Sequence, residues 1–423
     1  MPVSEASQHD FSACGTLQRV VWALPSSLAW TFVRRLGYTA ATMELSLYLH
    51  YPFCLRKCLY CAFNSVADAT CAPDEYVSGL LTEMELRRRA LDFDASAVTL
   101  YFGGGTPSLM EPALAGRLVD AAARLFRLAP DAEVTLECNP GTVTRERLAA
   151  FRAAGVNRLS LGVQSFDDGL LQSLGRIHSA GEALDAFAAA RGAGFGNVGI
   201  DLIHSLPGQT VAMWRGDLLR ACALAPEHLS VYGLTIEEGT PFFQLEQEGK
   251  LPLPDEDESA GMYEIAAEVL AARGYEQYEI ANFARAGYRS VHNSGYWNRR
   301  PFLGFGAGAH SFLRSPGYGV RFSSPERPED YLRSIARGEL PVAETRTLSQ
   351  RDAMAEFLFL GLRICSGISL EHFQGEFSVS FDEAYGDSCA DLFSAGLLES
   401  RDGFLRLTGK GRILSNQVFV RFL

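Results

Sequence analysis

The most informative part of the sequence is Tyr48-Leu-His-Tyr-Pro-Phe-Cys54-Leu-Arg-Lys-Cys58-Leu-Tyr-Cys61-Ala-Phe-Asn-Ser65. Its three cysteines are separated by three and then by two residues, a spacing that suits one loop wrapped around a single cluster. Three thiolates leave one iron of a [4Fe–4S] cluster without a protein ligand, and that iron is free to coordinate another molecule. Zinc sites use paired C-x-x-C spacing, so a zinc site with a distant fourth ligand is the less favoured alternative, together with three incidental cysteines.

Around this loop, apolar strands alternate with helices. Elements that alternate at this cadence build a parallel sheet from right-handed βαβ units, and six repeats rather than eight predict an α/β fold with an open, partial (β/α)6 barrel. Ligand sites in such folds lie at the carboxyl ends of the strands. The six strands are expected at residues 45–50, 97–102, 133–138, 158–163, 198–203 and 229–234. The helices between them are expected near residues 73–91, 111–128, 144–154, 180–193 and 211–224.

The regular alternation of strands and helices ends near residue 240, which favours further structural parts downstream of the barrel. A helix near residues 259–273 and a strand at 275–283 are expected first. From residue 349 the sequence again has the pattern of helices, followed by a short strand at 404–407 and a last helix capped by Thr408. This order of elements predicts a mainly helical, winged-helix-like domain. The predicted parts are an N-terminal extension over 1–42, the barrel over 43–240, an extension of the barrel over 241–345 and the C-terminal domain over 346–423.

The first 42 residues precede the predicted fold. An apolar run at residues 20–33 weakly resembles a signal peptide, but Pro25 interrupts it and no clean cleavage site follows. Met43 opens directly onto the first strand. We therefore treat residues 1–42 as an extension and Met43 as a candidate for the true start.

Composition limits the function classes. A net charge of −12 argues against a general nucleic-acid partner, because little would neutralise phosphates. No apolar run is long enough to span a bilayer, although peripheral membrane association stays open. Three of nine cysteines crowd into one loop, which indicates a cytosolic metal or redox site rather than a disulfide framework. The single cysteines expected to be ordinary small apolar residues are Cys14, Cys71, Cys222, Cys365 and Cys389.

The cysteine stretch resembles the radical S-adenosylmethionine superfamily. Within it, the chain resembles the branch that contains oxygen-independent coproporphyrinogen III oxidase (HemN) and the heme chaperone HemW, over residues 44–423. The resemblance implies that the open iron binds S-adenosylmethionine and that an electron from the cluster cleaves the sulfonium bond of that cofactor. It also implies an electron donor such as a flavodoxin or a ferredoxin.

Several strand ends carry the residues that would bind S-adenosylmethionine. Gly103-Gly-Gly-Thr-Pro107 follows the second strand, where residues without side chains let the backbone approach a ligand, and the resemblance implies that this loop receives the amino group of the methionine moiety. Glu137 ends the third strand and is expected to bond a ribose hydroxyl, with a surface carboxylate as the alternative. The expected cofactor-binding residues are Tyr48, Phe63, Gly104, Gly105, Thr106, Glu137, Gln164, Arg176 and Asp201.

The remaining polar positions follow the same resemblance. Gln164 and Arg176 match cofactor-contacting positions, with the Arg176 guanidinium expected on the methionine carboxylate. Asp201 lies in an apolar strand and needs a partner; a second ribose contact is implied, and a buried salt bridge is the alternative. Tyr48 and His50 share one face of the first strand. Tyr48 is expected to bond cofactor or substrate, whereas His50 is equally well a core histidine.

Two features separate the relatives. Oxygen-independent coproporphyrinogen oxidases carry a fourth cysteine two residues after the third, and this chain has Phe63 there. The text Cys-Ala-Phe-Asn-Ser resembles the HemW subgroup, as does the H-N-x-x-Y-W element at residues 292–297, which is associated there with heme handling. A histidine supplies an axial iron ligand and aromatic rings pack on a porphyrin face, although a core histidine is the alternative. The heme candidates are His292, Tyr296, Trp297 and His310.

The resemblance therefore predicts a cytoplasmic heme chaperone, which binds heme as cargo and passes it to an unidentified acceptor protein. The cluster and S-adenosylmethionine would regulate or drive the transfer. Whether the chain is also an enzyme stays open at this point. The enzymatic alternatives are decarboxylation of coproporphyrinogen III to protoporphyrinogen IX and, third, a HemN-like radical methyltransferase.

Overall fold

The computed structural model describes residues 42–67 and 71–423. The predicted N-terminal extension lies outside these ranges except for its last residue. Met43 is the first residue of strand β1 (Met43–Tyr51). Within the described ranges, no helix has the length and apolar character that crossing a membrane requires.

A curved sheet of twelve strands forms the body of the protein, in the order β12-β11-β10-β9-β1-β2-β3-β4-β5-β6-β8-β7. Strands β1 to β6 are parallel and stand in sequence order, which confirms the predicted α/β fold with a partial barrel. After β1, these strands are β2 (Ala95–Gly104), β3 (Glu133–Cys138), β4 (Arg158–Gln164), β5 (Val198–His204) and β6 (His228–Gly233).

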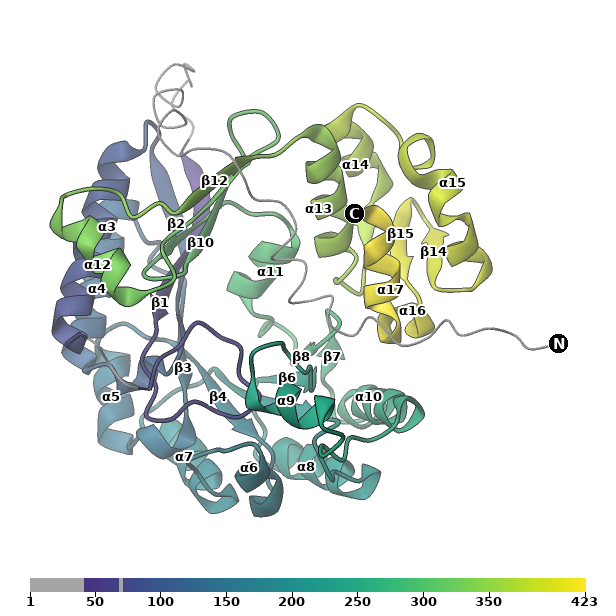
Figure 1. Cartoon of the computed structure of the whole chain (residues 1–423), viewed down its shortest axis with the longest axis horizontal. Helices are drawn as coiled ribbons and strands as arrows, with labels where there is room; N and C mark the ends of the chain where they lie inside the picture. The colour runs from purple at the N-terminus through teal and green to yellow at the C-terminus, as the bar shows by residue number, and fades with distance from the viewer. Residues whose placement is uncertain (1–41, 68–70) are drawn as a thin grey trace.

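Helices follow one another around the outside of this sheet (Figure 1). Their starts are fixed locally: the Ser179 side chain and Glu182 form a capping box at α7, and Thr144 caps α5. The helices are α3 (Pro73–Ala90), α4 (Pro112–Phe126), α5 (Arg145–Ala153), α6 (Asp168–Ser173), α7 (Ala180–Gly192) and α8 (Val211–Ala223).

Successive side chains of strand β1 point alternately into the hydrophobic core and into the barrel, where the candidate site lies. Leu45, Leu47 and Leu49 are fully buried in the main hydrophobic core. The opposite parity carries Tyr48 and His50, which confirms that these two side chains share a face. The core thus fixes the strand so that its polar residues point together into the barrel.

Further strands extend the sheet at both edges. Strand β9 (Phe302–Phe305) pairs parallel with β1, followed by antiparallel β10 (His310–Leu313), β11 (Val320–Ser323) and β12 (Glu344–Thr347). At the other edge, the single strand predicted over residues 275–283 is wrong. The chain instead forms the short antiparallel strands β7 (Glu276–Gln277) and β8 (Asn282–Ala284), because it turns back on itself between them, where the backbone N–H of Tyr278 donates to the Asn282 carbonyl at 3.2 Å.

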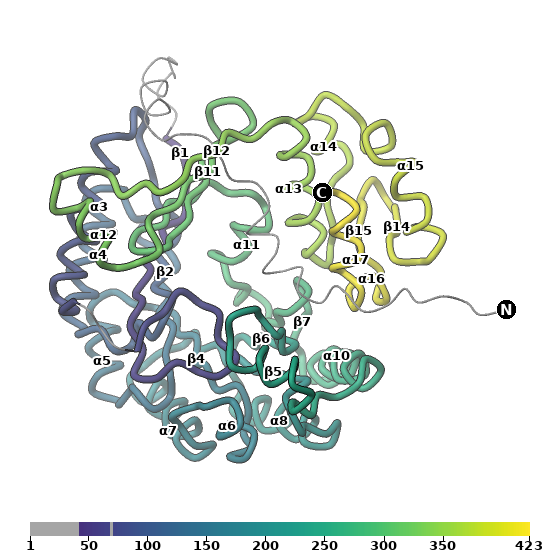
Figure 2. Tube along the Cα trace, in the orientation of Figure 1, coloured from purple at the N-terminus to yellow at the C-terminus, as the bar shows by residue number. Residues whose placement is uncertain are grey.

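Four helices of the middle region complete the body. They are α9 (Pro241–Gln247), α10 (Glu256–Ala271), α11 (Val291–Trp297) and α12 (Pro328–Ala336). The sequence interpretation found only α10, which begins a few residues early because Asp255 and Glu258 form a capping box. Helix α11 lies between the curved sheet and the C-terminal helices (Figure 2).

The C-terminal part has its own antiparallel sheet, in the order β13-β15-β14, and its own aromatic-rich core. The predicted strand at 404–407 and the Thr408 cap are confirmed, since the Thr408 side chain accepts from the Gly411 N–H. This part is mainly helical, as predicted. Its elements are α13 (Gln350–Gly361), β13 (Ile368–Ser369), α14 (Leu370–Phe377), α15 (Phe381–Ser394), β14 (Leu398–Arg401), β15 (Phe404–Leu407), α16 (Gly409–Ile413) and α17 (Ser415–Phe419).

Candidate cluster and cofactor site

The cysteine loop leaves the carboxyl end of β1 and is held in place by backbone hydrogen bonds. The N–H of Cys54 donates to the Val66 carbonyl at 2.9 Å, and the N–H of Val66 donates to the Pro52 carbonyl at 2.8 Å. All cysteines of the described residues are free, and Cys54, Cys58 and Cys61 are half-buried. Three free thiols on one loop at a strand end meet the first requirement of the predicted cluster.

Hydrogen-bond donors from two other elements reach the sulfur atoms. The Thr106 hydroxyl donates to Cys54 Sγ at 3.4 Å, and the Arg176 guanidinium donates to Cys58 Sγ at 3.5 Å. Such donors stabilise thiolate character, so the donor set fits an iron–sulfur cluster. In residues 42–67 and 71–423, no three histidine, cysteine or acidic side chains are arranged around a single metal ion. That finding concerns sites for one ion, whereas a cubane cluster spreads its ligands over several irons.

The glycine loop after β2 packs directly against the start of the cysteine loop. The N–H of Gly105 donates to the Tyr51 carbonyl at 2.8 Å. A Cβ at Gly105 would lie 2.7 Å from the Pro52 carbonyl oxygen, and a Cβ at Gly104 would lie 2.7 Å from the His50 ring. Gly104 also has φ of 114°, a value that favours glycine. Only residues without side chains therefore fit between this loop and β1.

Glu137 points into the barrel at the end of β3 rather than to solvent. Its carboxylate accepts from the Tyr101 hydroxyl at 2.7 Å and from the Gly104 N–H at 3.3 Å. Burial raises the pKa of this carboxyl from 4.5 to about 7. Sequence reasoning missed Tyr101, although it follows Thr99 at the strand period that puts both on one face.

Asp201 has partners, as its apolar strand required. The Ser160 hydroxyl lies 3.0 and 3.1 Å from its two carboxylate oxygens. Burial raises the pKa of Asp201, and hydrogen bonds from Ser230 and Ser160 oppose that rise. The partners are hydroxyl groups rather than a cation, so the buried salt bridge considered as an alternative is not the arrangement found.

Gln164 and Arg176 come together over Gly162. A Cβ at Gly162 would lie 3.0 Å from the Gln164 amide nitrogen and 3.4 Å from an Arg176 guanidinium nitrogen. Gln164 has φ of 68°, a strained conformation for this residue type that is common at functional sites. Arg176 donates to the Gly162 carbonyl at 2.7 Å, while its Nε is buried without a partner. An unpaired buried donor is suited to an incoming anionic group such as a carboxylate.

Tyr48 and His50 link β1 to the far end of the cysteine loop. The Tyr48 hydroxyl and His50 Nδ1 are 3.1 Å apart, and His50 Nε2 is 2.7 Å from the Asn64 carbonyl oxygen. Phe63, which precedes Asn64, projects from the loop with 68% of its surface exposed. The position of the extra oxidase cysteine therefore presents a large apolar ring to its surroundings.

The H-N-x-x-Y-W element forms helix α11, and its histidine lies inside the protein. His292 is 1% exposed, and its Nδ1 and Nε2 lie 2.7 Å from the Thr99 hydroxyl and 2.9 Å from the Tyr296 hydroxyl. Burial lowers the pKa of His292 to about 3, so the ring is neutral. The Trp297 ring lies under the Arg363 guanidinium at 4.7 Å, and its indole N–H is buried without a partner.

His310 differs from His292 in its surroundings. It begins β10 with an exposed side chain, and its ring has no hydrogen-bond partner among the described residues. The glycine-rich turn before it rests on the cysteine loop, where the Asn64 amide donates to the Ala307 carbonyl at 3.2 Å. The structure therefore brings His310 near the cysteine loop and keeps His292 deeper in the barrel.

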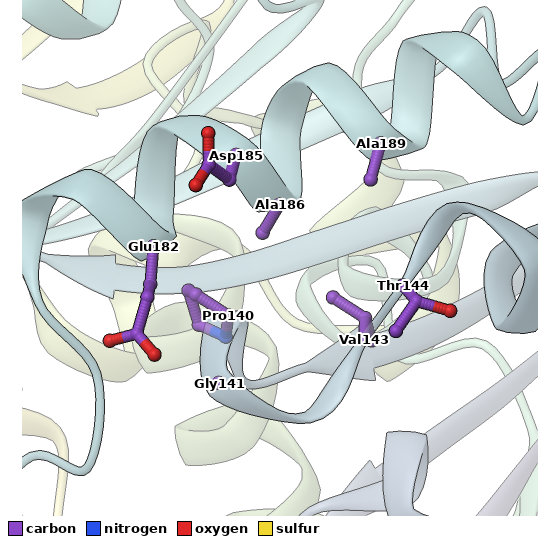
Figure 3. A pocket seen from close by; sticks show the side chains of 8 residues that line it. All are labelled: Pro140, Gly141, Val143, Thr144, Glu182, Asp185, Ala186 and Ala189. Atoms are coloured by element: carbon purple, nitrogen blue, oxygen red, sulfur yellow. The ribbon is translucent and has the colours of Figure 1, made fainter.

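A surface hollow of about 250 Å³ lies apart from these residues, between α7 and the turn that follows β3 (Figure 3). Glu182 and Asp185 line it from the helix. Glu182 is already engaged in the cap of α7, and none of the residues that line the hollow is a proposed cofactor or heme residue. It is not part of the site.

Comparisons with known proteins agree with this geometry. Residues 48–220 match the Radical SAM superfamily, and residues 348–414 match the HemN C-terminal domain. The chain is 37% identical over 379 residues to heme chaperone HemW of Bacillus subtilis (strain 168), which covers 89% of this chain and 99% of that one. It is 36% identical over 391 residues to heme chaperone HemW of Escherichia coli (strain K12), covering 90% and 98%.

A mammalian relative and a solved structure extend the comparison. The mitochondrial radical S-adenosyl methionine domain-containing protein 1 of Mus musculus is 37% identical over 392 residues, covering 91% of this chain and 88% of that one. Coproporphyrinogen III oxidase (HemN) from Escherichia coli has the same fold, with a TM-score of 0.78 at 23% identity over 96% of this chain and 98% of that chain. Radical SAM proteins use a [4Fe–4S] cluster and S-adenosylmethionine. The chain therefore belongs to the HemW family of radical S-adenosylmethionine proteins.

Proposed function

We propose that the protein is a cytoplasmic heme chaperone, which binds heme and passes it to an acceptor protein. The observation that carries the proposal is its likeness, along nearly their whole length, to relatives named heme chaperone HemW. Exposed Phe63 at the position of the additional oxidase cysteine supports this choice over porphyrinogen decarboxylation. Three accessible free thiols also suit a reducing compartment.

The cofactor residues have distinct proposed tasks. Cys54, Cys58 and Cys61 would hold the cluster, which when bound supplies an electron to the sulfonium of S-adenosylmethionine. The free Nε of Arg176 would receive the methionine carboxylate, and Glu137 would accept from a ribose hydroxyl. The further proposed contacts are Tyr48, Phe63, Gly104, Gly105, Thr106, Gln164 and Asp201.

An electron donor such as a flavodoxin or ferredoxin needs access to the cluster. Arg56 and Lys57 are exposed on the cysteine loop, so a basic surface stands next to the cluster ligands of an otherwise acidic chain. Lys57 also donates to the Phe63 carbonyl at 3.3 Å, which ties the two sides of the loop together. Basic side chains at this position complement the acidic surface of such donors.

Heme is proposed to bind near the mouth of the barrel, with His310 as the iron ligand. His310 is exposed and its ring has no partner among the described residues, whereas both ring nitrogens of His292 are engaged. Phe63 offers a flat apolar face to a porphyrin. In this arrangement Tyr296 and Trp297 do not contact the iron, because Tyr296 bonds His292 at 2.9 Å and Trp297 packs on Arg363.

The test is heme titration of anaerobically reconstituted, cluster-loaded protein. Wild type is expected to give a saturable Soret band that His310→Ala weakens strongly. His372→Ala, which removes an exposed histidine of the C-terminal part, is the matched control and is expected to bind heme normally. Absence of heme binding by wild type would refute the proposal. Protoporphyrinogen formed with S-adenosylmethionine and reductant would favour the oxidase instead, and S-adenosylhomocysteine would favour the methyltransferase.

A further inference from the structure

Tyr101 stands between the proposed ribose-binding carboxylate and the H-N-x-x-Y-W element. Its hydroxyl donates to Glu137 at 2.7 Å. Its ring stacks on the His292 ring, with the centroids 4.8 Å apart and the planes at 27°. A tyrosine hydroxyl lies in the plane of its ring and beyond its end, so whatever fixes the ring also fixes the direction of this donor.

The His292 ring is held by two hydrogen bonds, and its helix is anchored by a third residue. Thr99 and Tyr296 occupy its two nitrogens, at 2.7 and 2.9 Å. The helix that carries it is anchored by Glu133, whose carboxylate accepts from the backbone N–H of His292 at 2.9 Å and from that of the preceding residue at 3.0 Å. Acidic side chains at a helix start are stabilising, so the first turn of α11 is fixed to strand β3. The ring is therefore a rigid support for Tyr101.

The Tyr48 ring packs against both Tyr101 and His292 and leads on to the cysteine loop. Its centroid lies 6.1 Å from that of Tyr101, with the planes at 24°, and 6.4 Å from that of His292. Tyr48 bonds His50, and His50 bonds the Asn64 carbonyl at the end of the cysteine loop. A continuous layer of rings thus runs from the cluster loop through Tyr101 to α11.

We propose that His292 is a positioning residue of the S-adenosylmethionine site: its ring fixes Tyr101, and Tyr101 orients Glu137 toward the ribose of the cofactor. The inference rests on the assignment of Glu137 to a ribose hydroxyl and does not depend on heme. It gives the H-N-x-x-Y-W element a task in cofactor binding that is separate from any contact with iron. The chemical ligand served is the adenosine moiety.

The experiment compares two variants that both lose the hydrogen bonds of His292 but differ in the ring. His292→Leu removes the stack on Tyr101, whereas His292→Phe keeps a flat ring there. S-adenosylmethionine affinity is measured by equilibrium dialysis on anaerobically reconstituted protein, at matched cluster content. Loss of an aromatic pair in a buried site is expected to weaken S-adenosylmethionine binding by about tenfold in His292→Leu, with most of the affinity restored in His292→Phe.

A matched control comes from another buried histidine that packs on a tyrosine. His204 is buried, and its ring centroid lies 5.5 Å from that of Trp214 and 6.4 Å from that of Tyr263. His204→Leu therefore imposes a similar loss in the core away from Tyr101 and helix α11, and is expected to keep the wild-type affinity at matched cluster content. An equal weakening in this control would overturn the proposal.

Coupling to Tyr101 provides the decisive readout. Tyr101→Phe removes the hydroxyl that reaches Glu137, so in this background His292→Leu and His292→Phe are expected to bind S-adenosylmethionine equally. Independent, additive losses would overturn the proposal, as would wild-type affinity in His292→Leu. Heme titration of His292→Phe keeps the two ideas apart. Retained heme binding agrees with the positioning role, whereas loss of heme binding together with S-adenosylmethionine affinity as low as in His292→Leu would assign the effect to the ring nitrogens and overturn the proposal.

Discussion

Neutralising Glu137 is expected to stabilise the cluster-free protein while weakening its cofactor site. Burial raises the pKa of this carboxyl from 4.5 to about 7, so the native state resists ionisation of a group that ionises freely in the unfolded chain. Between these two pKa values the native state holds a proton that the unfolded state has lost. Stability therefore falls as pH rises through this window, and the full cost is present above pH 7.

The magnitude follows from the size of the pKa change. At about 1.4 kcal/mol per pKa unit, the ionised carboxylate costs the native state about 2 kcal/mol at pH 6 and about 3 kcal/mol at pH 8. Glu137→Gln removes this cost and keeps an amide oxygen that accepts from Tyr101 or Gly104. The variant is expected to gain unfolding free energy relative to wild type, and its advantage is expected to grow by about 1 kcal/mol from pH 6 to pH 8.

The assay is urea unfolding of cluster-free protein at the two pH values, with S-adenosylmethionine affinity measured in parallel on reconstituted protein. Glu146→Gln is the control, because Glu146 is exposed and hydrogen bonds to its own backbone N–H and to Thr144 lower its pKa. That variant is expected to show no gain at either pH. An advantage of Glu137→Gln that did not change with pH, or a loss of stability at both values, would refute the reasoning.

Two further predictions concern packing and charge. Arg299 is a buried cation after α11 that bonds the Glu376 carboxylate of α14 at 2.7 Å. Arg299→Met is expected to lower the free energy of unfolding by about 3 kcal/mol and to speed proteolysis between the barrel and the C-terminal part. Arg289→Met removes an exposed ion pair and should lower it by under about 1 kcal/mol. Gly105→Ala places a Cβ 2.7 Å from the Pro52 carbonyl oxygen and is expected to cost about 1–3 kcal/mol and lower the iron content, while Gly196→Ala meets open space and should load iron normally.

Sequence patterns predicted those features whose determining interactions are local in the chain. The spacing of Cys54, Cys58 and Cys61 lies within one loop, and hydrophobic periodicity located strands β1 to β6 because each buries apolar residues at its own period. Parity alone put Tyr48 and His50 on one face. The prediction of one strand over residues 275–283 is wrong because a turn divides this segment into β7 and β8. That turn depends on the pairing of β8 with β6, which the sequence pattern does not show.

The place of His292 could not be found in this way. Short helix α11 has little periodicity, and its position depends on Glu133 and Thr99, which are more than 150 residues away in the chain. The same holds for Tyr101, whose hydroxyl meets a carboxylate on the neighbouring strand. A sequence shows that these residues are polar or aromatic but not which side chain each one meets.

The parallel α/β body and the likeness to one family could be read from the sequence alone, because they depend on periodicity within single elements and on spacing within one loop. The same spacing predicts Cys54, Cys58 and Cys61 as the cluster ligands. The burial of His292 against Tyr101 and the exposure of His310 near the cysteine loop are visible in the three-dimensional structure alone. Burial and hydrogen-bond partners arise from packing between segments that are far apart in the chain. For His292 these segments are strands β2 and β3, against which helix α11 packs.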